Sequence, residues 1–309
     1  MNQTNPQEQV YSAFEQAFPS NEAFRVFHGR GGLVRGFEQI NIEYYAPVLW
    51  CMVYQPVNEA PLMALVESIK ANAAAWGIEH IYIQRRHEKG DPVEVIMGDA
   101  SYIDKEFVVT EQNLKYWVTL GRNQNTGLFL DMAHGRKWVR ENCQNKSVLN
   151  LFAYTCSLGV AAAAGSARQV VNVDMAKAAI KRGQQNFALN EFSGAGTAFM
   201  AQDVFKMIKK IGQKGPYDLV ICDPPSFQTK AFDVKKDYAK TLKKIAPFIA
   251  EKGKLMLCLN SPALDEQFLI DTVAESIPEA RFDGRLENPS VLADKDEQSS
   301  LKIMFFSLK

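Results

Sequence analysis

The residues best suited to chemistry lie in one short segment, Asp223-Pro-Pro-Ser-Phe227, directly after the apolar run YDLVIC (217–222). Its two prolines, Pro224 and Pro225, fix φ and remove two backbone donors, so the segment is rigid. The carboxylate of Asp223 can accept a hydrogen bond from an amino group, and the ring of Phe227 can stack on a planar base. The alternative is a simple turn that ends a strand. If 217–222 is a parallel strand, the segment lies at the sheet edge where ligands bind.

A second segment with binding potential is VLNLFAYTCSLGVAAAAG, residues 148–165. It reads as an apolar strand, a turn of small residues from Tyr154 to Gly159, and a helix without bulky side chains. The start of such a helix exposes unpaired N–H groups and a positive dipole end. The next apolar run, 169–173, ends in Asp174, whose carboxylate can accept hydrogen bonds from ribose hydroxyls. The pattern predicts a phosphate or nucleoside site, with a purely structural crossover as the alternative.

These segments belong to a regular alternation that begins near Lys146. It predicts strands at 148–152, 169–173, 199–202, 217–222, 254–259, 281–286 and 301–308, the last pair antiparallel. Helices are predicted at 175–189, 204–211, 235–250 and 265–276. Such alternation is typical of a mainly parallel sheet with helices on both faces. The earlier residues mix helices (5–18 and 62–76) with short strands. We expect a smaller α+β domain over 1–120, ending in a β-hairpin connector, and an α/β domain over 121–309.

Composition places the chain among globular proteins, with 47% hydrophobic and 23% charged residues in a length of 309. No apolar run is long enough to span a membrane, and the N-terminus lacks a signal-peptide pattern. We therefore expect a cytoplasmic protein without a membrane partner. Five widely spaced cysteines favour reduced thiols that fill the core. Four histidines without ligand spacing argue against a metal site.

The charge balance limits the kinds of nucleic-acid protein this chain can be. With 35 basic and 35 acidic residues the net charge is zero, which excludes a strongly basic coat protein. An enzyme that acts on RNA needs only a local basic face. Two loops concentrate positive charge, one with Arg25, His28, Arg30 and Arg35, the other at 84–89 (QRRHEK). Either they are solvated turns or they face RNA.

Seven segments together resemble class I S-adenosylmethionine-dependent methyltransferases, in particular the bacterial 23S rRNA methyltransferases. They are NTGLFLDMAHGR (125–136), VLNLFAYTCSLGVAAAAG (148–165), VVNVDMAKAAIKRGQQNFALN (170–190), AQDVF (201–205), YDLVICDPPSF (217–227), AFDVKKDY (231–238) and GKLMLCLNS (253–261). The resemblance covers roughly residues 40–309. It implies a Rossmann-like sheet of seven strands, mostly parallel with an antiparallel last strand. It also implies S-adenosyl-L-methionine as the cofactor and RNA as the substrate.

The resemblance further implies roles for individual side chains. Asp174 would bind the ribose hydroxyls, Asp203 the adenine amino group, and Arg136 the carboxylate of the cofactor. Asp223 and Pro224 would face the transferred methyl group and the target base. The predicted catalytic residues are Asp223, Pro224, Pro225, Phe227 and Asn260, and the predicted cofactor-binding residues are Phe129, Asp131, Arg136, Asn150, Phe152, Ala153, Tyr154, Thr155, Ser157, Gly159, Asp174, Met175, Asn186, Asp203, Val204 and Asp223.

Two branches of this family differ at the end of the strand 254–259. Cytosine-C5 enzymes carry there a cysteine whose thiolate adds to the pyrimidine ring. This chain has Asn260 at that position, and Cys258 lies two residues earlier. The guanine-N7 branch carries an asparagine, and a direct transfer to a ring nitrogen needs no covalent intermediate.

We therefore expect methylation of 23S rRNA at guanine N7 or another ring or amino nitrogen. Cytosine-C5 methylation through Cys258 is one alternative, and a non-catalytic cofactor- or RNA-binding protein is another. The expected partner is 23S rRNA or a large-subunit assembly intermediate. Both a monomer and a homodimer agree with the sequence.

Overall fold

A computed structural model describes residues 5–121, 125–192, 194, 196–225, 227–228 and 232–309. The chain forms two compact units, Met1–Asp131 with Pro289–Glu297 and Met132–Asn288 with Gln298–Lys309. The sequence placed a boundary near residue 120. In the structure the following segment stays with the first unit, because Thr119 N–H donates to Thr126 O (2.9 Å) and the hydroxyls of Tyr45 and Thr126 share a hydrogen bond of 3.0 Å.

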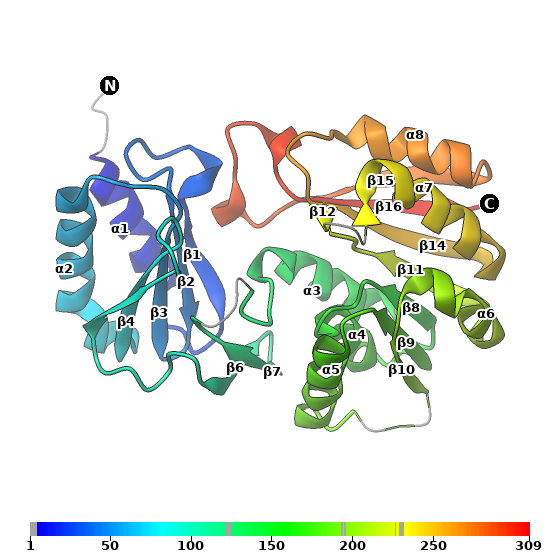
Figure 1. The fold of residues 1–309 in the computed structure, drawn as a ribbon, viewed down its shortest axis with the longest axis horizontal. Helices are drawn as coiled ribbons and strands as arrows, with labels where there is room; N and C mark the ends of the chain where they lie inside the picture. Colours follow the sequence, from blue (N-terminus) through cyan, green and yellow to red (C-terminus); the bar gives the residue numbers. More distant parts are fainter. Residues whose placement is uncertain (1–4, 122–124, 193, 195, 226, 229–231) are drawn as a thin grey trace. The chain divides into compact units, whose positions relative to one another are not determined.

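The first unit is built on a five-stranded sheet in the order β1-β2-β3-β4-β5. Helix α2 connects the parallel neighbours β3 and β4, and the other pairs are antiparallel. Figure 1 shows α1 and α2 on one side of this sheet, where their apolar side chains complete one core. The elements are α1 (Pro6–Ala17), β1 (Phe24–His28), η1 (Gly29–Gly31), β2 (Ile40–Tyr45), β3 (Val48–Val53), α2 (Glu59–Trp76), β4 (His80–Arg85) and β5 (Val93–Met97), with the short helix η4 (Ser290–Leu292) from the later segment.

The predicted hairpin before residue 120 is present as a separate two-stranded sheet, β6 (Glu106–Glu111) and β7 (Leu114–Thr119). Its two turn residues, Gln112 and Asn113, have φ angles of 52° and 63°. Such left-handed pairs match the twist of the strands in tight hairpins.

The second unit contains a seven-stranded sheet in the order β10-β9-β8-β11-β14-β16-β15. The first five strands pair in parallel, and β16 runs antiparallel to both β14 and β15. This arrangement confirms the predicted fold class. The elements are η2 (Leu130–Met132, across the boundary), α3 (Ala133–Asn142), β8 (Ser147–Leu151), α4 (Ser157–Ala164), β9 (Gln169–Asp174), α5 (Lys177–Leu189), β10 (Thr197–Ala201), α6 (Val204–Lys214), β11 (Tyr217–Cys222), β12 (Phe227–Gln228), β13 (Phe232–Asp233), α7 (Val234–Ile245), η3 (Ala246–Phe248), β14 (Ile249–Leu259), α8 (Glu266–Ser276), β15 (Ala280–Leu286), η5 (Glu297–Ser299, also across a boundary) and β16 (Lys302–Leu308).

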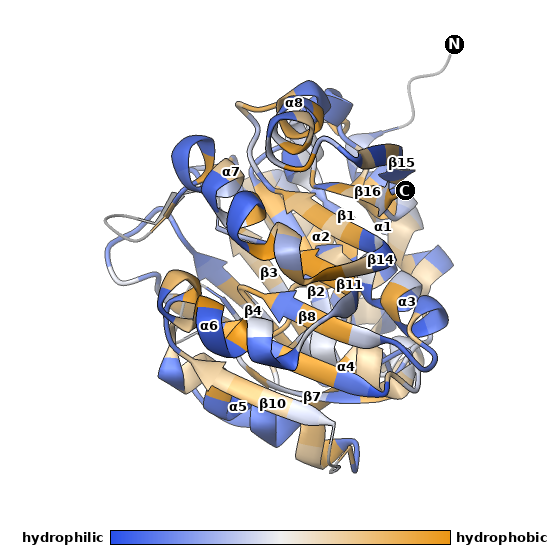
Figure 2. Cartoon of the chain, turned by 90° about the vertical axis from the view of Figure 1, so that its right-hand side faces the viewer, coloured by the Kyte–Doolittle hydropathy of each residue, from blue (hydrophilic) through white to orange (hydrophobic). Residues whose placement is uncertain are grey.

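The winding of the chain covers both faces of this sheet. From β8 it moves outward through β9 to β10, then returns to β11 on the other side of β8. Because parallel crossovers are right-handed, the reversal puts the two sets of helices on opposite faces. Accordingly α3, α4 and α5 contact one another in series, and so do α6, α7 and α8. The covered strands are strongly apolar, as Figure 2 shows for β14, whereas α6 carries both polar and apolar residues.

One predicted element ends in the wrong place. The helix predicted over 235–250 stops at Ile245, a short 3-10 turn follows, and β14 already begins at Ile249. Gly253, taken as the helix terminator, lies inside that strand, where a Cβ would meet Ile249 Cγ2 at 2.6 Å. Apolar spacing continues across the junction, so periodicity alone did not reveal the change from helix to strand.

Candidate functional site

The predicted polar residues gather at one edge of the seven-stranded sheet. Asp174 ends β9, Asp203 follows β10, Asp223 follows β11 and Asn260 follows β14. The turn around Tyr154 follows β8, between them. Because these five strands are parallel neighbours, their carboxyl ends share an edge. The order reverses between β8 and β11, which is the point where open sheets bind ligands.

The turn after β8 has an unusual backbone. Phe152, Tyr154 and Cys156 have φ angles of 57°, 48° and 61°, a left-handed conformation that non-glycine residues seldom adopt. Left-handed residues that alternate with ordinary ones turn successive N–H groups to one side and form a concave anion-binding surface. The strained turn leads directly into the N-terminus of α4. The helix start therefore offers N–H donors to an acidic ligand group, whereas the N–H groups of Ala153, Tyr154 and Cys156 already donate within the protein.

Asp174 holds this turn in place. Its Oδ2 accepts a hydrogen bond from Tyr154 N–H (2.8 Å), and its Oδ1 accepts one from Ala176 N–H (2.8 Å). A carboxylate has about four acceptor positions, so capacity remains for a diol. The next residue, Met175, leaves 49% of its surface exposed. Together the two side chains offer acceptors and an apolar face of the kind a nucleoside requires.

Other predicted residues are bonded to the main chain of the turn or buried in the core near the edge. Asn186, fully buried in α5, donates from Nδ2 to Thr155 O at 3.0 Å. Ala153 N–H donates to Val173 O at 3.0 Å. Val204 is part of the hydrophobic core. Asn186 and Val204 are thus buried in the scaffold of the edge.

A buried pair of asparagines lies beneath the turn, and the sequence analysis selected Asn150 for cofactor binding but missed Asn172. Asn150 and Asn172 are partners in the register of β8 and β9, and Asn150 Nδ2 donates to Asn172 Oδ1 at 2.9 Å. A Cβ on Gly159 would meet that oxygen at 2.1 Å, so the lone glycine of α4 makes room for the pair. The signal was present, because both strands carry an asparagine at the same place, in VLNL and VVNV.

Arg136 on α3 is the one strongly buried cation among the predicted residues. Only 1% of its surface is exposed. Its Nη1 lies 3.5 Å from the hydroxyl of Ser157, the first residue of α4. A buried guanidinium requires anionic or carbonyl partners, and it presents a planar fork that matches a carboxylate. Its position beside a helix N-terminus strengthens the positive potential there.

Three further predicted residues are Asp203, Phe129 and Asp131. Asp203 has a structural role at the start of α6. Oδ1 of Asp203 caps α6 by accepting from the N–H groups of Phe205 (2.8 Å) and Lys206 (3.2 Å). Phe129 and Asp131 belong to the first unit, where Phe129 is 43% exposed. Burial would lower the pKa of Arg25, but the carboxylates of Glu43 and Asp131 outweigh it and raise that pKa above its usual range.

The rigid segment after β11 is fastened by a tyrosine that the sequence analysis did not select. Tyr238 on α7 is buried, and its hydroxyl lies 3.1 Å from both Cys222 O and Cys258 O. It therefore joins the ends of β11 and β14, from which Asp223 and Asn260 emerge. Burial raises the pKa of Tyr238 well above its ordinary value, so the hydroxyl stays protonated and donates.

The predicted catalytic segment itself is described in part. Asp223 is half-buried, Pro224 is buried and Pro225 is exposed. The backbone of Phe227 pairs with Asp233 between β12 and β13. The predicted stacking of the Phe227 ring lies outside the described side chains.

Cys258 and Asn260, the two candidate catalytic side chains at the end of β14, differ in their exposure to solvent. Cys258 is completely buried, whereas Asn260 is exposed just beyond the strand. Cys222 pairs with Leu257 across the sheet, so Asn260 lies further out than the start of the Asp223 segment. Lys302 on β16 is also completely buried, and its ammonium donates to Ser261 O (3.3 Å) and Ser300 O (3.1 Å). This lysine holds the main chain just after Asn260, and nothing in the strand pattern distinguished it.

The described residues offer neither a metal site nor a membrane-spanning helix. No group of three or more His, Cys, Asp or Glu side chains in the described part could hold a metal ion. None of the described helices is long and apolar enough to span a bilayer. All five cysteines are buried and unpaired with one another.

Comparisons with known proteins place this geometry in a family. A family model described as S-adenosylmethionine-dependent methyltransferase matches residues 24–307. The ribosomal RNA large subunit methyltransferase K/L of Pseudoalteromonas translucida is 32% identical over 77% of this chain and 34% of its own length. The ribosomal RNA large subunit methyltransferase K of Neisseria meningitidis is 32% identical over 72% of this chain and 65% of its own length.

A solved structure from Streptococcus mutans matches with a TM-score of 0.83 at 23% identity, covering 100% of this chain and 83% of its own, and shows the same fold. The chain spans only about a third of the length of the K/L relative. The family model, in contrast, matches nearly the whole of this chain. The chain therefore belongs to the S-adenosylmethionine-dependent methyltransferase family, as its motifs predicted.

Proposed function

We propose that this chain transfers a methyl group from S-adenosylmethionine to a base of 23S rRNA, at guanine N7 or another ring or amino nitrogen. The observation that carries the proposal is the set of three carboxylates, Asp174, Asp203 and Asp223, at the carboxyl ends of three parallel strands of one sheet. The names of the relatives quoted above support large-subunit rRNA as the substrate class.

The residues present suit the cofactor. Asp174 would accept from the ribose hydroxyls, Met175 would lie against the nucleoside, and Asp203 would accept from the adenine amino group. The N–H groups at the start of α4, together with Arg136, suit the carboxylate of the methionine part. When bound, S-adenosylmethionine supplies an electrophilic methyl group on its sulfonium sulfur.

The chain's own residues would act on the target base. Asp223 would accept a hydrogen bond from an amino group of the base, and Pro224 keeps its loop from moving away. Exposed Asn260 would orient a base edge. Transfer to a ring nitrogen would form an N–C bond and break the C–S bond of the cofactor, with S-adenosylhomocysteine as the leaving group. Positioning and exclusion of water then provide most of the catalysis, without a covalent enzyme intermediate.

The burial of Cys258 favours this chemistry over cytosine-C5 methylation. A thiol nucleophile must reach C6 of the pyrimidine as a thiolate. Cys258 is completely enclosed in β14, and its carbonyl is held by Tyr238. Exposed Asn260 occupies the accessible position instead.

The proposal is tested with the purified full chain, methyl-labelled S-adenosylmethionine, and rRNA from a strain that lacks the chain. We expect label in one nucleoside of 23S rRNA, identified by digestion and mass spectrometry. Asp223→Ala should abolish transfer, whereas Asp271→Ala, an exposed position on α8, should not. Cys258→Ala should retain transfer.

Three outcomes would contradict the proposal. A 5-methylcytosine product that disappears in Cys258→Ala would favour the cysteine mechanism. Cofactor binding without turnover on any RNA would favour a non-catalytic protein. Label in protein or small molecules alone would point to a different substrate.

A further inference from the structure

Two loops of the first unit that are far apart in sequence meet at one tyrosine. Tyr54 follows β3, and the guanidinium carbon of Arg30 lies 4.6 Å from the centre of its ring. The corresponding carbon of Arg86, directly after β4, lies 5.6 Å from the same ring. Since β3 and β4 are parallel with Val53 opposite Arg85, Tyr54 and Arg86 emerge side by side. The fold thus brings both basic loops of the sequence to one aromatic side chain.

The loop that carries Arg30 is tightly built. A Cβ on Gly29 would lie 1.9 Å from Phe37 O, and one on Gly31 would lie 2.2 Å from Ala293 O. Gly31 O also accepts from Lys295 N–H at 2.9 Å. Close packing of main chain on main chain fixes this turn, so exposed Arg30 extends from a preorganised support. The same contact brings exposed Lys295 next to it.

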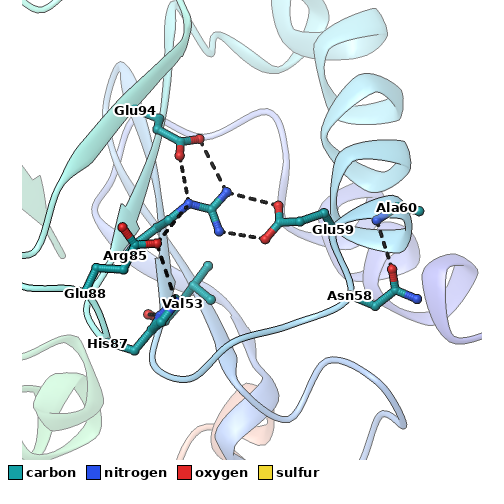
Figure 3. Close-up of polar contacts among 8 residues, drawn as sticks. All are labelled: Val53, Asn58, Glu59, Ala60, Arg85, His87, Glu88 and Glu94. Carbon is teal, nitrogen blue, oxygen red and sulfur yellow. Dashed lines mark hydrogen bonds and ion pairs between the residues drawn. The ribbon is translucent and has the colours of Figure 1, made fainter.

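The neighbouring Arg85 shows what a purely structural arginine looks like here. Figure 3 shows its guanidinium between Glu59 and Glu94, to which it donates at 2.7 and 3.0 Å and at 2.7 Å. Only 13% of the side chain is exposed. Within the described residues no carboxylate pairs with the guanidinium of Arg30. The charge of Arg85 is neutralised locally, whereas that of Arg30 is presented to solvent.

Histidine does not add to this charge near neutral pH. Burial and the nearby positive charge of Arg25 lower the pKa of His28 to about 4. The positive potential therefore comes from the two arginines and Lys295. We call Arg30, Tyr54, Arg86 and Lys295 the arginine–tyrosine surface.

We propose that the arginine–tyrosine surface binds an unpaired segment of the substrate RNA. Arg30 is exposed and stacks on the Tyr54 ring, so its N–H edge can reach a phosphate, and the planar groups offer a platform for a base. Lys295 adds a point charge for the backbone. The proposal rests on the proposed RNA substrate and assigns part of its recognition to the first unit, outside the methyl-transfer edge.

The test measures RNA binding directly, with full-length protein and a fluorescently labelled 23S rRNA transcript over a series of salt concentrations. Arg30→Ala with Arg86→Ala should weaken binding about tenfold or more and reduce the salt slope by about 1 to 2. Tyr54→Ala should weaken binding several-fold, while Tyr54→Phe, which keeps the ring, should bind as wild type. The control Lys105→Ala removes one exposed positive charge from the same unit.

Two further measurements separate this surface from the methyl-transfer edge. Affinity for S-adenosylhomocysteine and the melting temperature should not change in the arginine variants. The KM for RNA should rise while kcat stays near wild type. If the wild type methylates RNA and the double variant has the same RNA affinity and KM, the arginine–tyrosine surface does not bind RNA, while the proposed function stands. If the wild type binds no RNA, both proposals fail.

Discussion

The edge of the seven-stranded sheet and the arginine–tyrosine surface place their polar side chains in opposite ways. At the edge, Asp174 and Asp203 already hold main-chain N–H groups while they retain acceptor capacity. On the surface, Arg30 is exposed and has no acidic partner among the described side chains. We therefore expect ligand binding and stability to be coupled at the edge and separate on the surface. Substitutions should reveal the coupling.

The largest effect is expected for Asp174→Ala. It removes the acceptor of Tyr154 N–H and Ala176 N–H and the proposed partner of the ribose, so both stability and cofactor binding should fall. Unsatisfied N–H groups cost about 1–3 kcal/mol, and loss of charge-assisted bonds should weaken S-adenosylhomocysteine binding about 10- to 100-fold. Calorimetric titration and thermal unfolding measure the two effects. Weaker binding at unchanged stability would break the proposed coupling.

A smaller effect is expected for Tyr238→Phe. The carbonyls of Cys222 and Cys258 lose their shared donor, which should cost about 1–3 kcal/mol and let the Asp223 segment move. We expect kcat to fall with little change in cofactor affinity. The matched control is Tyr217→Phe, because that buried hydroxyl bonds Ile211 O at the opposite end of β11. It should lose similar stability and keep kcat, and equal loss of kcat in both variants would contradict the role given to Tyr238.

Two arginines of the first unit sharpen the comparison. Arg85→Met should lower stability by roughly 1 kcal/mol and leave the salt dependence of RNA binding unchanged, because its charge is already paired. Arg30→Met should reduce the salt slope by about 1. Urea unfolding and binding titrations at several salt concentrations distinguish the two. Equal salt slopes in the two variants would remove the distinction between them.

The last prediction concerns pH and His28. Its native pKa of about 4 lies below the ordinary value of 6.5, so the unfolded chain takes up the proton first. The contribution to stability is therefore constant above pH 6.5 and is lost as pH falls from 6.5 to 4. His28→Asn should lose less stability than wild type between pH 7 and pH 5, as measured by melting temperature. The same pH dependence in both proteins would show that His28 does not titrate in this way.

The position of these carboxylates could be predicted from the sequence because each lies at or just after the end of an apolar strand. Position along the chain then becomes position in space as soon as the strands are parallel. Asn172, Tyr238 and Lys302 were missed because their roles depend on contacts across the sheet. The meeting of Arg30 with Arg86 was missed for the same reason. Their loops were recognised as basic, but only the parallel pairing of β3 and β4 places Arg86 beside Tyr54.

The most direct test of the account is the nucleoside content of 23S rRNA from cells with and without this chain. Quantitative mass spectrometry should show that deletion removes one N-methylated nucleoside and that the wild-type chain restores it. The nucleoside we expect first is 7-methylguanosine. Asp223→Ala should not restore it. Loss of a C-methylated nucleoside such as 5-methylcytidine, or an unchanged set of modifications, would contradict the account.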